Sequence, residues 1–497
     1  MKKITLALGL AVMLAGTNLT AKEVTLENAK LIGDEKISSP YGTLEIANNY
    51  PTDETSTKLY DAMDFQRASQ AYIWSTPIVS FYTWKEQQNK VYGSGQLGEF
   101  VVFSSLKEKR GVVTGNLTTP YIIQFFNLAK GAVEIEYPKG KTASAILDLW
   151  QRPITNMGLM GPDKGKGGTY ILVGPEDDVK KYKKDGVAVY QSATNNVFMG
   201  TRLINLSSES TGAFKSGLKM GIVGQDKKPT VLIEKVDKEW SATAPRGMAY
   251  WKTLNTILNE EPVREQDKVW MAMIEPLGVQ KGIEFKPNER QSKILMKGVA
   301  MGELMLRNMQ TNPRFAEPYW SKTSWYKSFD FSIAQSTDYK VELDERAVWF
   351  YEAVTSTQEM VNPSVGSGQV YMTTKRDSNG DLFRADKTYK LTIPKDVPVA
   401  QFWSVVLYSE NTRRPYDNGL VNLDDVSLSS RMEKIQKNKD GSTDIYIGAK
   451  APKGMESNYL KTVGKDGWFI YFRLYAPTEP FFDKSFSLPD FVEINIK

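Results

Sequence analysis

The segment GPDKGKGGTYILVGP, residues 161–175, most resembles a phosphate-binding loop, because it contains five glycines and two lysines. A P-loop, however, reads GxxxxGK followed by Ser or Thr, and it leads from a strand into a helix whose N-terminus faces the anion. Here the interval from Gly161 to Gly165 is one residue short, and the apolar run that follows is typical of a strand. We therefore expect a tight turn that leads into a strand at 169–173 and forms, at most, the rim of a pocket.

The segment WFIYFRLY, residues 468–475, places a cation on an aromatic strand. Side chains alternate between the two faces of a strand, so Tyr471, Arg473 and Tyr475 share one face. A guanidinium flanked by tyrosines can bind a carboxylate or line a groove on which sugars stack. Arg473 and Tyr475 are therefore candidate ligand-binding residues. The alternative is that Arg473 pairs with an internal Asp or Glu.

Asp148, in the string ILDLW, is the acidic residue that we take as a candidate catalytic group. A glycosidase needs two carboxylates roughly 5–9 Å apart, and Asp148 could be one of them. Trp150, two residues later, is added to the same candidate pocket as a ligand-binding residue. The alternative for Asp148 is an internal ion pair. Asp344 stands at the start of a predicted helix and is expected to cap it.

The chain contains no histidine and no cysteine. Ser-His-Asp and Cys-His nucleophilic sites, HExxH zinc sites and disulfides are therefore excluded. Catalysis would have to use carboxylates, lysine, tyrosine, serine with a lysine base, or a hard metal bound by oxygen. The segments 377–381 and 439–444 lack the spacing of a calcium-binding loop and are predicted to be hairpin turns. No cofactor and no metal-ligand set is predicted.

The first 21 residues have the order of a secretory signal peptide, with two lysines, an apolar stretch at 4–15, and small or polar residues up to Ala21. Cleavage after Ala21 predicts a periplasmic or secreted bacterial protein. Thr17 stands where a lipoprotein needs Cys, and no later segment has 18 consecutive apolar residues, so no membrane anchor is expected. Loss of the two lysines lowers the formal net charge from +5 to +3, and the remaining basic residues are interspersed with acids. No nucleic-acid partner is expected.

Apolar periodicity divides the rest of the chain into helical and strand-rich parts. Residues 56–76 are predicted to form a helix that ends before Pro77, because the residue before proline disfavours helix. Short apolar runs bounded by Gly, Pro and Asn predict strands from about 98 to 233, and three helical segments follow between 245 and 312. A predicted helix at 344–360 precedes five predicted strands.

These patterns predict a mainly β fold, with two β-sandwich or jelly-roll-like domains joined by a short helical layer. The expected boundaries are 1–21 for the signal peptide and 22–240 for the N-terminal β domain. A helical connecting segment is expected at 241–312, and the C-terminal β-sandwich domain at 313–497.

Long strings in both halves carry a family resemblance. The first half contains YDAMDFQRASQAYIW, NLTTPYIIQFFNL and DLWQRPITNMGLMGPDKGKGGTYILVGP, and the second contains LDERAVWFYEAV, TYKLTIPKDVPVAQFWSVVLYSENTRRP and GWFIYFRLYAPTEPFFDKSF. Together they resemble a bacterial two-domain family whose halves are the unknown-function families 1254, N-terminal, and 1214, C-terminal. The resemblance implies two β-sandwich domains with helical connections in an exported protein. It implies no reaction.

The resemblance also singles out one polar motif. In the family it commonly reads Asn-x-Asp-Thr-x-Tyr, which corresponds here to Asn116–Tyr121. Asn116, Thr119 and Tyr121 match, and the resemblance implies that they contribute to a polar pocket. Thr118 stands where the family often has an acid, which argues against a catalytic carboxylate from this motif.

Three hypotheses for function remain open at this stage. The first is an exported soluble protein that binds a small organic or carbohydrate ligand in a polar-aromatic pocket. The second is a carboxylate-based hydrolase acting on glycosides, and the third is a hard-metal-dependent enzyme. The 11 Trp, 24 Tyr and 21 Phe residues suit sugar stacking and core packing equally, so they do not separate the hypotheses. Binding is placed first because most enzyme classes use His or Cys.

Overall fold

The computed structural model describes residues 23–203, 207–234, 238–329 and 331–496. The predicted signal peptide and its cleavage site after Ala21 lie outside these residues. The chain divides into two compact units, Met1–Gln66 and Arg67–Lys497, and each is described by itself.

The first unit contains a four-stranded sheet with the strand order β1-β2-β3-β4. Ile37 and Leu44 are register partners on adjacent strands and both are buried, so they form an apolar contact on one face of the sheet. The helix α1 begins directly after the sheet, and the Thr55 hydroxyl accepts a hydrogen bond from the backbone N–H of Glu45. The elements are β1 (Glu23–Thr25), η1 (Leu26–Asn28), β2 (Glu35–Ser39), β3 (Gly42–Ala47), β4 (Tyr50–Pro51) and the first part of α1 (Asp53–Tyr92), which continues into the second unit.

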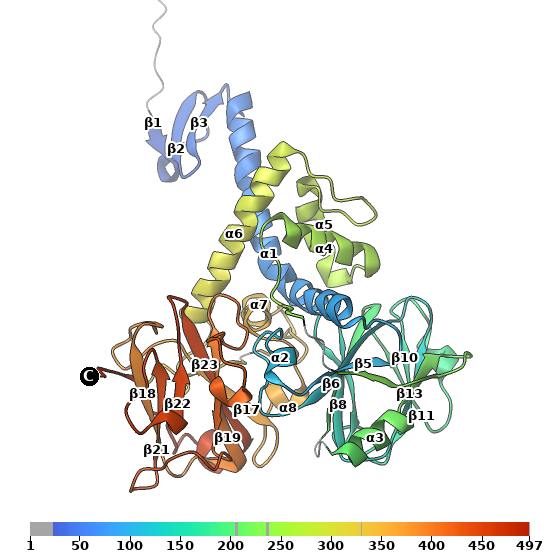
Figure 1. The fold of residues 1–497 in the computed structure, drawn as a ribbon. Helices are drawn as coiled ribbons and strands as arrows, with labels where there is room; N and C mark the ends of the chain where they lie inside the picture. Colours follow the sequence, from blue (N-terminus) through green and yellow to red (C-terminus); the bar gives the residue numbers. More distant parts are fainter. Residues whose placement is uncertain (1–22, 204–206, 235–237, 330, 497) are drawn as a thin grey trace, which may run out of the picture. The chain divides into compact units, whose positions relative to one another are not determined.

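The second unit contains an N-terminal β region of two sheets (Figure 1). One sheet has the order β11-β10-β7-β13-β14 and the other the order β15-β5-β6-β12-β8-β9. Ile135, Ile146, Leu172 and Met199 are fully shielded from solvent in their shared core. The strands are β5 (Glu99–Phe103), β6 (Tyr121–Asn127), β7 (Val133–Tyr137), β8 (Thr142–Asp148), β9 (Pro153–Gly158), β10 (Gly168–Val173), β11 (Val187–Gln191), β12 (Asn196–Leu203), β13 (Lys219–Ile222), β14 (Lys228–Pro229) and β15 (Val231–Ile233). The helices are α2 (Leu106–Lys109), η2 (Val179–Tyr182) and α3 (Ser208–Gly217).

Helix α1 continues through Pro77, so the prediction that it ends before this residue is wrong. Proline removes one helical hydrogen bond, because it has no backbone N–H. The hydroxyl groups of Ser75 and Thr76 donate to backbone carbonyls one turn earlier, and Nε2 of Gln151 donates to the Pro77 carbonyl at 2.8 Å. Phe81, one turn after the proline, is fully buried. Tertiary packing on both sides of Pro77 therefore outweighs its local effect.

Three α-helices and two short 3-10 helices form the predicted helical layer in the described residues, and the longest of them packs closely on α1. A Cβ atom added at Gly298 would lie 2.3 Å from Cβ of Ala68, and one at Gly302 would lie 2.7 Å from the Tyr72 side chain. Only glycine permits this approach of two helices. The helices of the layer are α4 (Met248–Glu260), η3 (Glu265–Asp267), α5 (Lys268–Ile274), η4 (Glu275–Leu277) and α6 (Glu289–Thr311).

The C-terminal β region also consists of two sheets, ordered β16-β17-β23-β19-β20 and β22-β21-β18-β24 (Figure 1). All residues of the central strand β23 are buried, so both of its faces pack against protein. The strands are β16 (Tyr326–Lys327), β17 (Gln369–Thr374), β18 (Thr388–Ile393), β19 (Val399–Ser409), β20 (Ser427–Ser429), β21 (Thr443–Gly448), β22 (Tyr459–Lys461), β23 (Trp468–Pro477) and β24 (Val492–Ile494). The helices are α7 (Leu343–Glu352), α8 (Gln358–Val361), η5 (Leu423–Asp425), η6 (Glu456–Asn458) and α9 (Glu479–Phe482).

The predicted helix at 344–360 is interrupted after α7. Ala353 adopts an extended backbone, and the residues between α7 and α8 turn toward the cavity described below. Asp344 does not cap α7; its carboxylate forms an ion pair with Arg314 at 2.7 Å. The fold as a whole is mainly β, as predicted. Within the described residues, no helix combines the length and the apolar character needed to cross a membrane.

Candidate functional site

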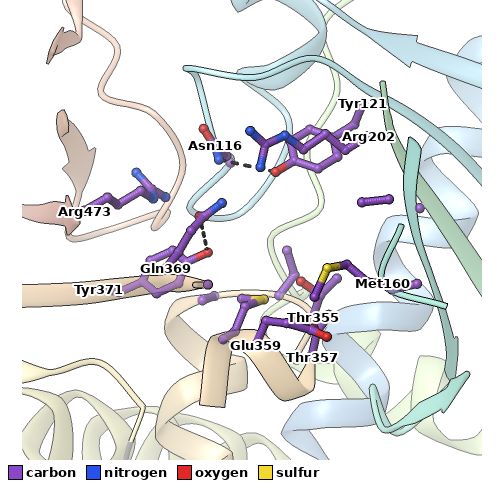
Figure 2. A pocket seen from close by; sticks show the side chains of 18 of the residues that line it. Asn116, Tyr121, Met160, Arg202, Thr355, Thr357, Glu359, Gln369, Tyr371 and Arg473 are labelled. Carbon is purple, nitrogen blue, oxygen red and sulfur yellow. Dashed lines mark hydrogen bonds between the residues drawn. The ribbon is translucent and has the colours of Figure 1, made fainter. Parts of the chain in front are cut away.

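A cavity of about 420 Å³ lies between the two β regions of the second unit (Figure 2). One wall comes from the sheet that contains β5, β6, β8 and β12, and the opposite wall comes from β17 and β23. The segment from α7 to α8 closes a third side with Thr355, Thr357 and Glu359. The cavity therefore exists only where the two β regions meet.

Strand periodicity supplies the N-terminal wall. Phe198, Gly200 and Arg202 of β12 face the cavity, whereas Met199 between them packs into the core of the N-terminal β region. Tyr121 of β6 belongs to the same wall, and Figure 2 shows it beside Arg202. This face of the sheet therefore presents polar as well as apolar side chains to the cavity.

The apolar part of the cavity is aromatic. Trp84 of α1 packs against Phe103 and Phe198, with ring centroids 6.3 and 5.5 Å apart. Leu159 and Met160, which precede the glycine-rich loop, are partly exposed and lie at the edge of the cavity. A ligand that fills this space must present an apolar body to these rings.

The C-terminal wall is formed by five polar side chains on two adjacent strands. Tyr371 and Gln369 of β17 are register partners of Arg473 and Tyr475 of β23, and Tyr471 lies next along the same face. The Tyr371 hydroxyl donates to Oε1 of Gln369 at 2.9 Å (Figure 2). The alternation predicted from WFIYFRLY therefore places Arg473 among tyrosines.

Arg473 is buried without a carboxylate partner. The side chain is 1% exposed, and no ion pair forms between it and any acid of the described residues. Its Nη2 donates to the Tyr408 hydroxyl at 2.8 Å and to the Thr114 carbonyl at 3.3 Å. Nε and Nη1 have no hydrogen-bond partner. Because an arginine stays protonated and unpaired buried donors are costly, this guanidinium retains binding capacity for an acceptor.

A hydrogen-bonded network joins the two β regions beside Arg473. Nδ2 of Asn116 donates to the hydroxyl oxygens of Tyr121 and Tyr475, both at 3.3 Å. Oδ1 of Asn116 accepts from the backbone N–H and the hydroxyl of Thr118. The Thr118 and Tyr475 hydroxyls are 2.6 Å apart, so Tyr475 is held from two sides. This network fixes the loop before β6 against β23.

Lys109, the last residue of α2, is a second buried cation in the cavity wall. Nζ donates to the carbonyl oxygens of Leu117 and Thr119, at 3.2 and 2.8 Å, and the residue is 3% exposed. Burial lowers the pKa of Lys109 to about 7; Glu108 opposes this shift and Arg473 adds to it. At neutral pH this side chain is therefore divided between its charged and neutral forms.

The cavity carries an excess of positive groups. Lys109, Arg202 and Arg473 line it, and Glu359 is the one acidic side chain among the described residues that do so. Glu359 accepts a hydrogen bond from Nδ2 of Asn156 at 3.2 Å. Arg202 forms no ion pair within the described part of the chain. Two arginines and a lysine that is partly protonated at neutral pH, against one carboxylate, favour an anionic ligand.

Residues 97–221 match the family described as "Protein of unknown function (DUF1254)", and residues 368–479 match "Protein of unknown function (DUF1214)". The chain carries a DUF1254 region followed by a DUF1214 region. This order confirms the resemblance seen in the sequence. The DUF1254 region supplies Lys109, Tyr121 and Arg202 to the cavity, and the DUF1214 region supplies Arg473 and Tyr475.

Two solved structures are similar to this chain. The VPA0106 protein from Vibrio parahaemolyticus is 16% identical, with a TM-score of 0.50, over 87% of this chain and 100% of its own. An uncharacterized protein from Burkholderia cenocepacia is 10% identical, with a TM-score of 0.40, over 89% of this chain and 98% of its own. No curated protein matches this chain in sequence. The Vibrio structure has a similar fold at low sequence identity.

The sequence-predicted site residues divide into two groups. Asn116, Tyr121, Arg473 and Tyr475 line the cavity, two from the DUF1254 region and two from the DUF1214 region. Thr119, Asp148 and Trp150 do not line it. Thr119 contributes its carbonyl to Lys109, while its own buried hydroxyl has no hydrogen-bond partner.

Asp148 forms an internal ion pair at the end of β8. Its carboxylate accepts from the backbone N–H and from Nε of Arg152, at 3.0 and 2.9 Å, and Nη2 of Arg152 lies 2.8 Å away. Asp148 is 2% exposed, so the pair accounts for its charge. The structure brings no second carboxylate of the cavity to Asp148.

Trp150 is buried in a different cluster. Its ring lies under the guanidinium of Arg264, 3.9 Å from the ring centroid, and 5.3 Å from that of Arg346. The Trp74 ring packs against it at 5.7 Å. The aromatic surface of Trp150 is therefore already occupied by protein groups.

The glycine-rich loop and the segments 377–381 and 439–444 are turns, as predicted. Asp163 in the loop accepts hydrogen bonds from the backbone N–H of Gly158 and the Tyr170 hydroxyl, both at 2.7 Å. Asp377 and Asp440 likewise accept from backbone N–H groups of their own turns. Within the described ranges, no group of three or more acidic side chains is placed to hold a metal ion.

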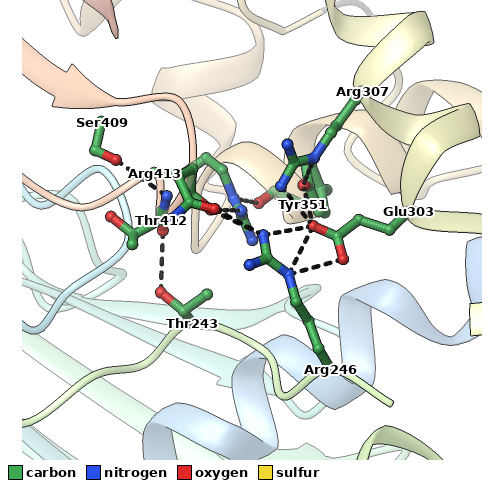
Figure 3. Close-up of polar contacts among 9 residues, drawn as sticks. Thr243, Arg246, Glu303, Arg307, Tyr351, Ser409, Thr412 and Arg413 are labelled. Carbon is green, nitrogen blue, oxygen red and sulfur yellow. Dashed lines mark hydrogen bonds and ion pairs between the residues drawn. The ribbon is translucent and has the colours of Figure 1, made fainter. Parts of the chain in front are cut away.

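Arginine side chains also gather around Glu303 of α6, and we call this group the Glu303 cluster (Figure 3). Arg246 donates to both carboxylate oxygens at 2.7 to 3.0 Å, Arg307 donates at 2.8 Å, and the Tyr351 hydroxyl donates at 3.1 Å. Arg413 donates from Nε to the Tyr351 carbonyl at 3.2 Å. Each guanidinium of this cluster therefore has acceptors supplied by the protein.

Sequence reasoning did not identify Lys109, Arg202 or Glu359 as cavity residues. Arg202 carried a usable signal, because it follows Phe198 and Gly200 at a spacing of two residues on one predicted strand. Lys109 lies in the charged string LKEKR, which looks like an exposed helical turn. Only the packing of the following loop over α2 buries it.

Proposed function

We propose that the protein binds a small organic acid with an apolar or aromatic body in the cavity between its DUF1254 and DUF1214 regions. The observation that carries this proposal is Arg473, a buried guanidinium that lines the cavity with two unpaired N–H positions and no carboxylate partner. A carboxylate would satisfy these donors through charge-assisted hydrogen bonds. The cavity volume of about 420 Å³ falls within the range of small-molecule sites.

Charge favours an acid over a neutral sugar as the ligand. Two arginines, a lysine that is partly protonated at neutral pH, and one carboxylate line the cavity within the described part of the chain. The hydrolase hypothesis requires two carboxylates, whereas Glu359 is the only acid among the described lining residues. We therefore propose binding rather than glycoside hydrolysis.

The test compares an acid with its neutral isostere. We expect 4-phenylbutanoate to raise the melting temperature in proportion to its occupancy, and 4-phenylbutanamide to leave it unchanged. Arg473→Met should weaken binding of the acid by at least about tenfold, because a hydrogen bond to a charged group contributes roughly 1.5–3 kcal/mol. Isothermal titration calorimetry on both proteins measures this loss.

Arg384→Met is the matched control, because Arg384 belongs to the same β region but forms an exposed ion pair with Asp386. It should bind 4-phenylbutanoate as the wild type does. Equal shifts by the acid and the amide, or full affinity in Arg473→Met, would show that the cavity does not recognise a carboxylate.

We also propose that the mature protein is periplasmic or secreted, after cleavage following Ala21. The order of charged, apolar and small residues at the N-terminus supports this. We also propose that the helical connecting segment between the two β domains begins near residue 240 and ends near residue 312. Intact-mass measurement on the periplasmic fraction tests the export, and a full-length cytoplasmic product would contradict it.

A further inference from the structure

Lys109 has a hydrogen-bonding pattern that suits a neutral amine. A neutral lysine has two N–H donors and one lone pair, whereas the protonated form has three donors. The Leu117 and Thr119 carbonyls accept two hydrogen bonds from Nζ, and no carboxylate of the described residues pairs with it. Two acceptors account for both N–H groups of the neutral form, and the lone pair remains free.

The cavity would bring a carbonyl group of a bound acid to this lone pair. Lys109 lines the same cavity as Arg473, and Thr114 and Leu117, which bind these two side chains, belong to one loop. A carboxylate held by Arg473 would therefore place the atoms next to it near the lysine. A desolvated lysine beside another cation is an activated nucleophile toward carbonyl groups.

We infer that Lys109 forms an imine with a 2-oxo acid whose carboxylate is held by Arg473. This inference rests on the proposed function, since Arg473 supplies the recognition of the acid. In the reaction the lysine nitrogen bonds to the carbonyl carbon, and the resulting carbinolamine loses water. The two amine hydrogens leave with the carbonyl oxygen as that water, so the step needs no oxidant or reductant.

The protonation state of Lys109 supports the reaction at neutral pH. Its pKa is lowered to about 7, chiefly by burial. About half of the side chains are then neutral at pH 7, against an ordinary lysine whose neutral fraction is smaller by roughly a thousandfold. The groups that act on it are Glu108, which opposes the shift, and Arg473, which adds to it.

Lys281 provides a matched comparison within the same chain. Its Nζ also donates to two backbone carbonyls, those of Leu258 and Glu261, at 2.7 and 2.8 Å. It is exposed, however, and it does not line the cavity. The two lysines therefore differ in burial and in the neighbouring arginine, but not in their backbone acceptors.

The experiment traps the imine. The protein is incubated at pH 7 with 2-oxo-4-phenylbutanoate and sodium cyanoborohydride, and the adduct is located by intact mass and peptide mapping. We expect one adduct, on Lys109, formed at least tenfold faster than on Lys281. Lys109→Arg should remove it, Lys281→Arg should leave it, and Arg473→Met should slow it at least tenfold. The rate on Lys109 should rise to half of its maximum near pH 7.

The outcomes separate this inference from the proposed function. If 4-phenylbutanoate and the oxo acid both stabilise the wild type but no adduct forms on Lys109, the imine is wrong and acid binding stands. If adducts are spread over surface lysines and persist unchanged in Lys109→Arg, the inference is also overturned. If neither compound shifts the melting temperature, the proposed function fails, and the imine fails with it.

Discussion

The cavity and the Glu303 cluster both gather arginines from distant parts of the sequence, yet they satisfy them in opposite ways. Glu303 takes hydrogen bonds from Arg246 and Arg307, and every guanidinium of that cluster has acceptors from the protein. Arg473 is buried and faces tyrosine rings, but it donates hydrogen bonds only to a tyrosine hydroxyl and one carbonyl. A closed network of charges serves the architecture, whereas an incomplete one in a cavity keeps its capacity for a ligand.

The largest expected effect is on the closed network. Glu303→Gln should destabilise the protein by about 3 kcal/mol at pH 7, toward the lower end of the cost of breaking a buried pair, because both arginines are partly exposed. Burial raises the pKa of Glu303, but Arg246 and Arg307 lower it to about 2 in net. Since the folded-state pKa is depressed, the contribution is present above pH 4.5 and is lost as the pH falls toward 2.

Denaturant unfolding of the wild type and Glu303→Gln at pH 7 and pH 2.5 measures this difference. Glu289→Gln, which removes an exposed ion pair with Lys293, is the control and should change stability by less than about 1 kcal/mol. Acid binding should be unaffected. A Glu303→Gln variant of full stability would erase the contrast between the two sites.

The second effect concerns Lys109 and depends on pH. Its folded-state pKa of about 7 lies below its ordinary value of 10.5, so the unfolded state binds more protons between these two values. The wild type should therefore gain roughly 2–3 kcal/mol relative to Lys109→Met as the pH rises from 7 to 9. Unfolding curves across this range test the gain. A constant difference between the two proteins would show that the amine is not desolvated.

The third effect tests the alternative interpretation of Asp148. Asp148→Asn should lower stability by about 1–3 kcal/mol, because Arg152, its partner, is partly exposed and can be solvated. Affinity for 4-phenylbutanoate should not change. Thermal melts and calorimetry on the same variant give both answers, with Asp386→Asn as an exposed control. Lost affinity with unchanged stability would return Asp148 to the site.

The smallest effect is expected at Arg202. It faces the cavity from the DUF1254 side and is only partly buried, so solvent and salt screen its charge. Arg202→Met should weaken binding of the acid by less than about 1 kcal/mol, and this loss should shrink at high salt. Titrations at low and high ionic strength measure it. A loss as large as that of Arg473→Met would mean that both β regions anchor the carboxylate equally.

Local patterns predicted the elements of this fold better than their ends. The alternation in WFIYFRLY correctly placed Tyr471, Arg473 and Tyr475 on one face of β23. Side chains alternate along a strand whatever packs against its two faces. The prediction at Pro77 was wrong because tertiary contacts around the proline, including the hydrogen bond from Gln151 to its carbonyl, outweigh the lost helical hydrogen bond. Where an element ends therefore depends on partners that are distant in the sequence.

Only part of the candidate site could be predicted from the sequence. Asn116 and Tyr121 were found through the motif, but the same motif pointed to Thr119, whereas Thr118 contacts Tyr475. Trp150 was predicted to bind a ligand, but Arg264 and Trp74 pack against its ring. Lys109 could not be predicted, because its burial comes from a loop that folds back over α2. These are long-range facts, and no residue spacing encodes them.

The cavity between two β regions also affects how the protein can assemble. The polar groups that line it extend along the chain from Lys109 to Tyr475, and the hydrogen bond between Asn116 and Tyr475 joins the two β regions. Neither half produced alone would contain a complete site. A ligand would therefore act as a clamp that slows separation of the halves, rather than as a stabiliser of either one. Amide hydrogen exchange in the loop from 112 to 119 should report this clamping before any global measurement does.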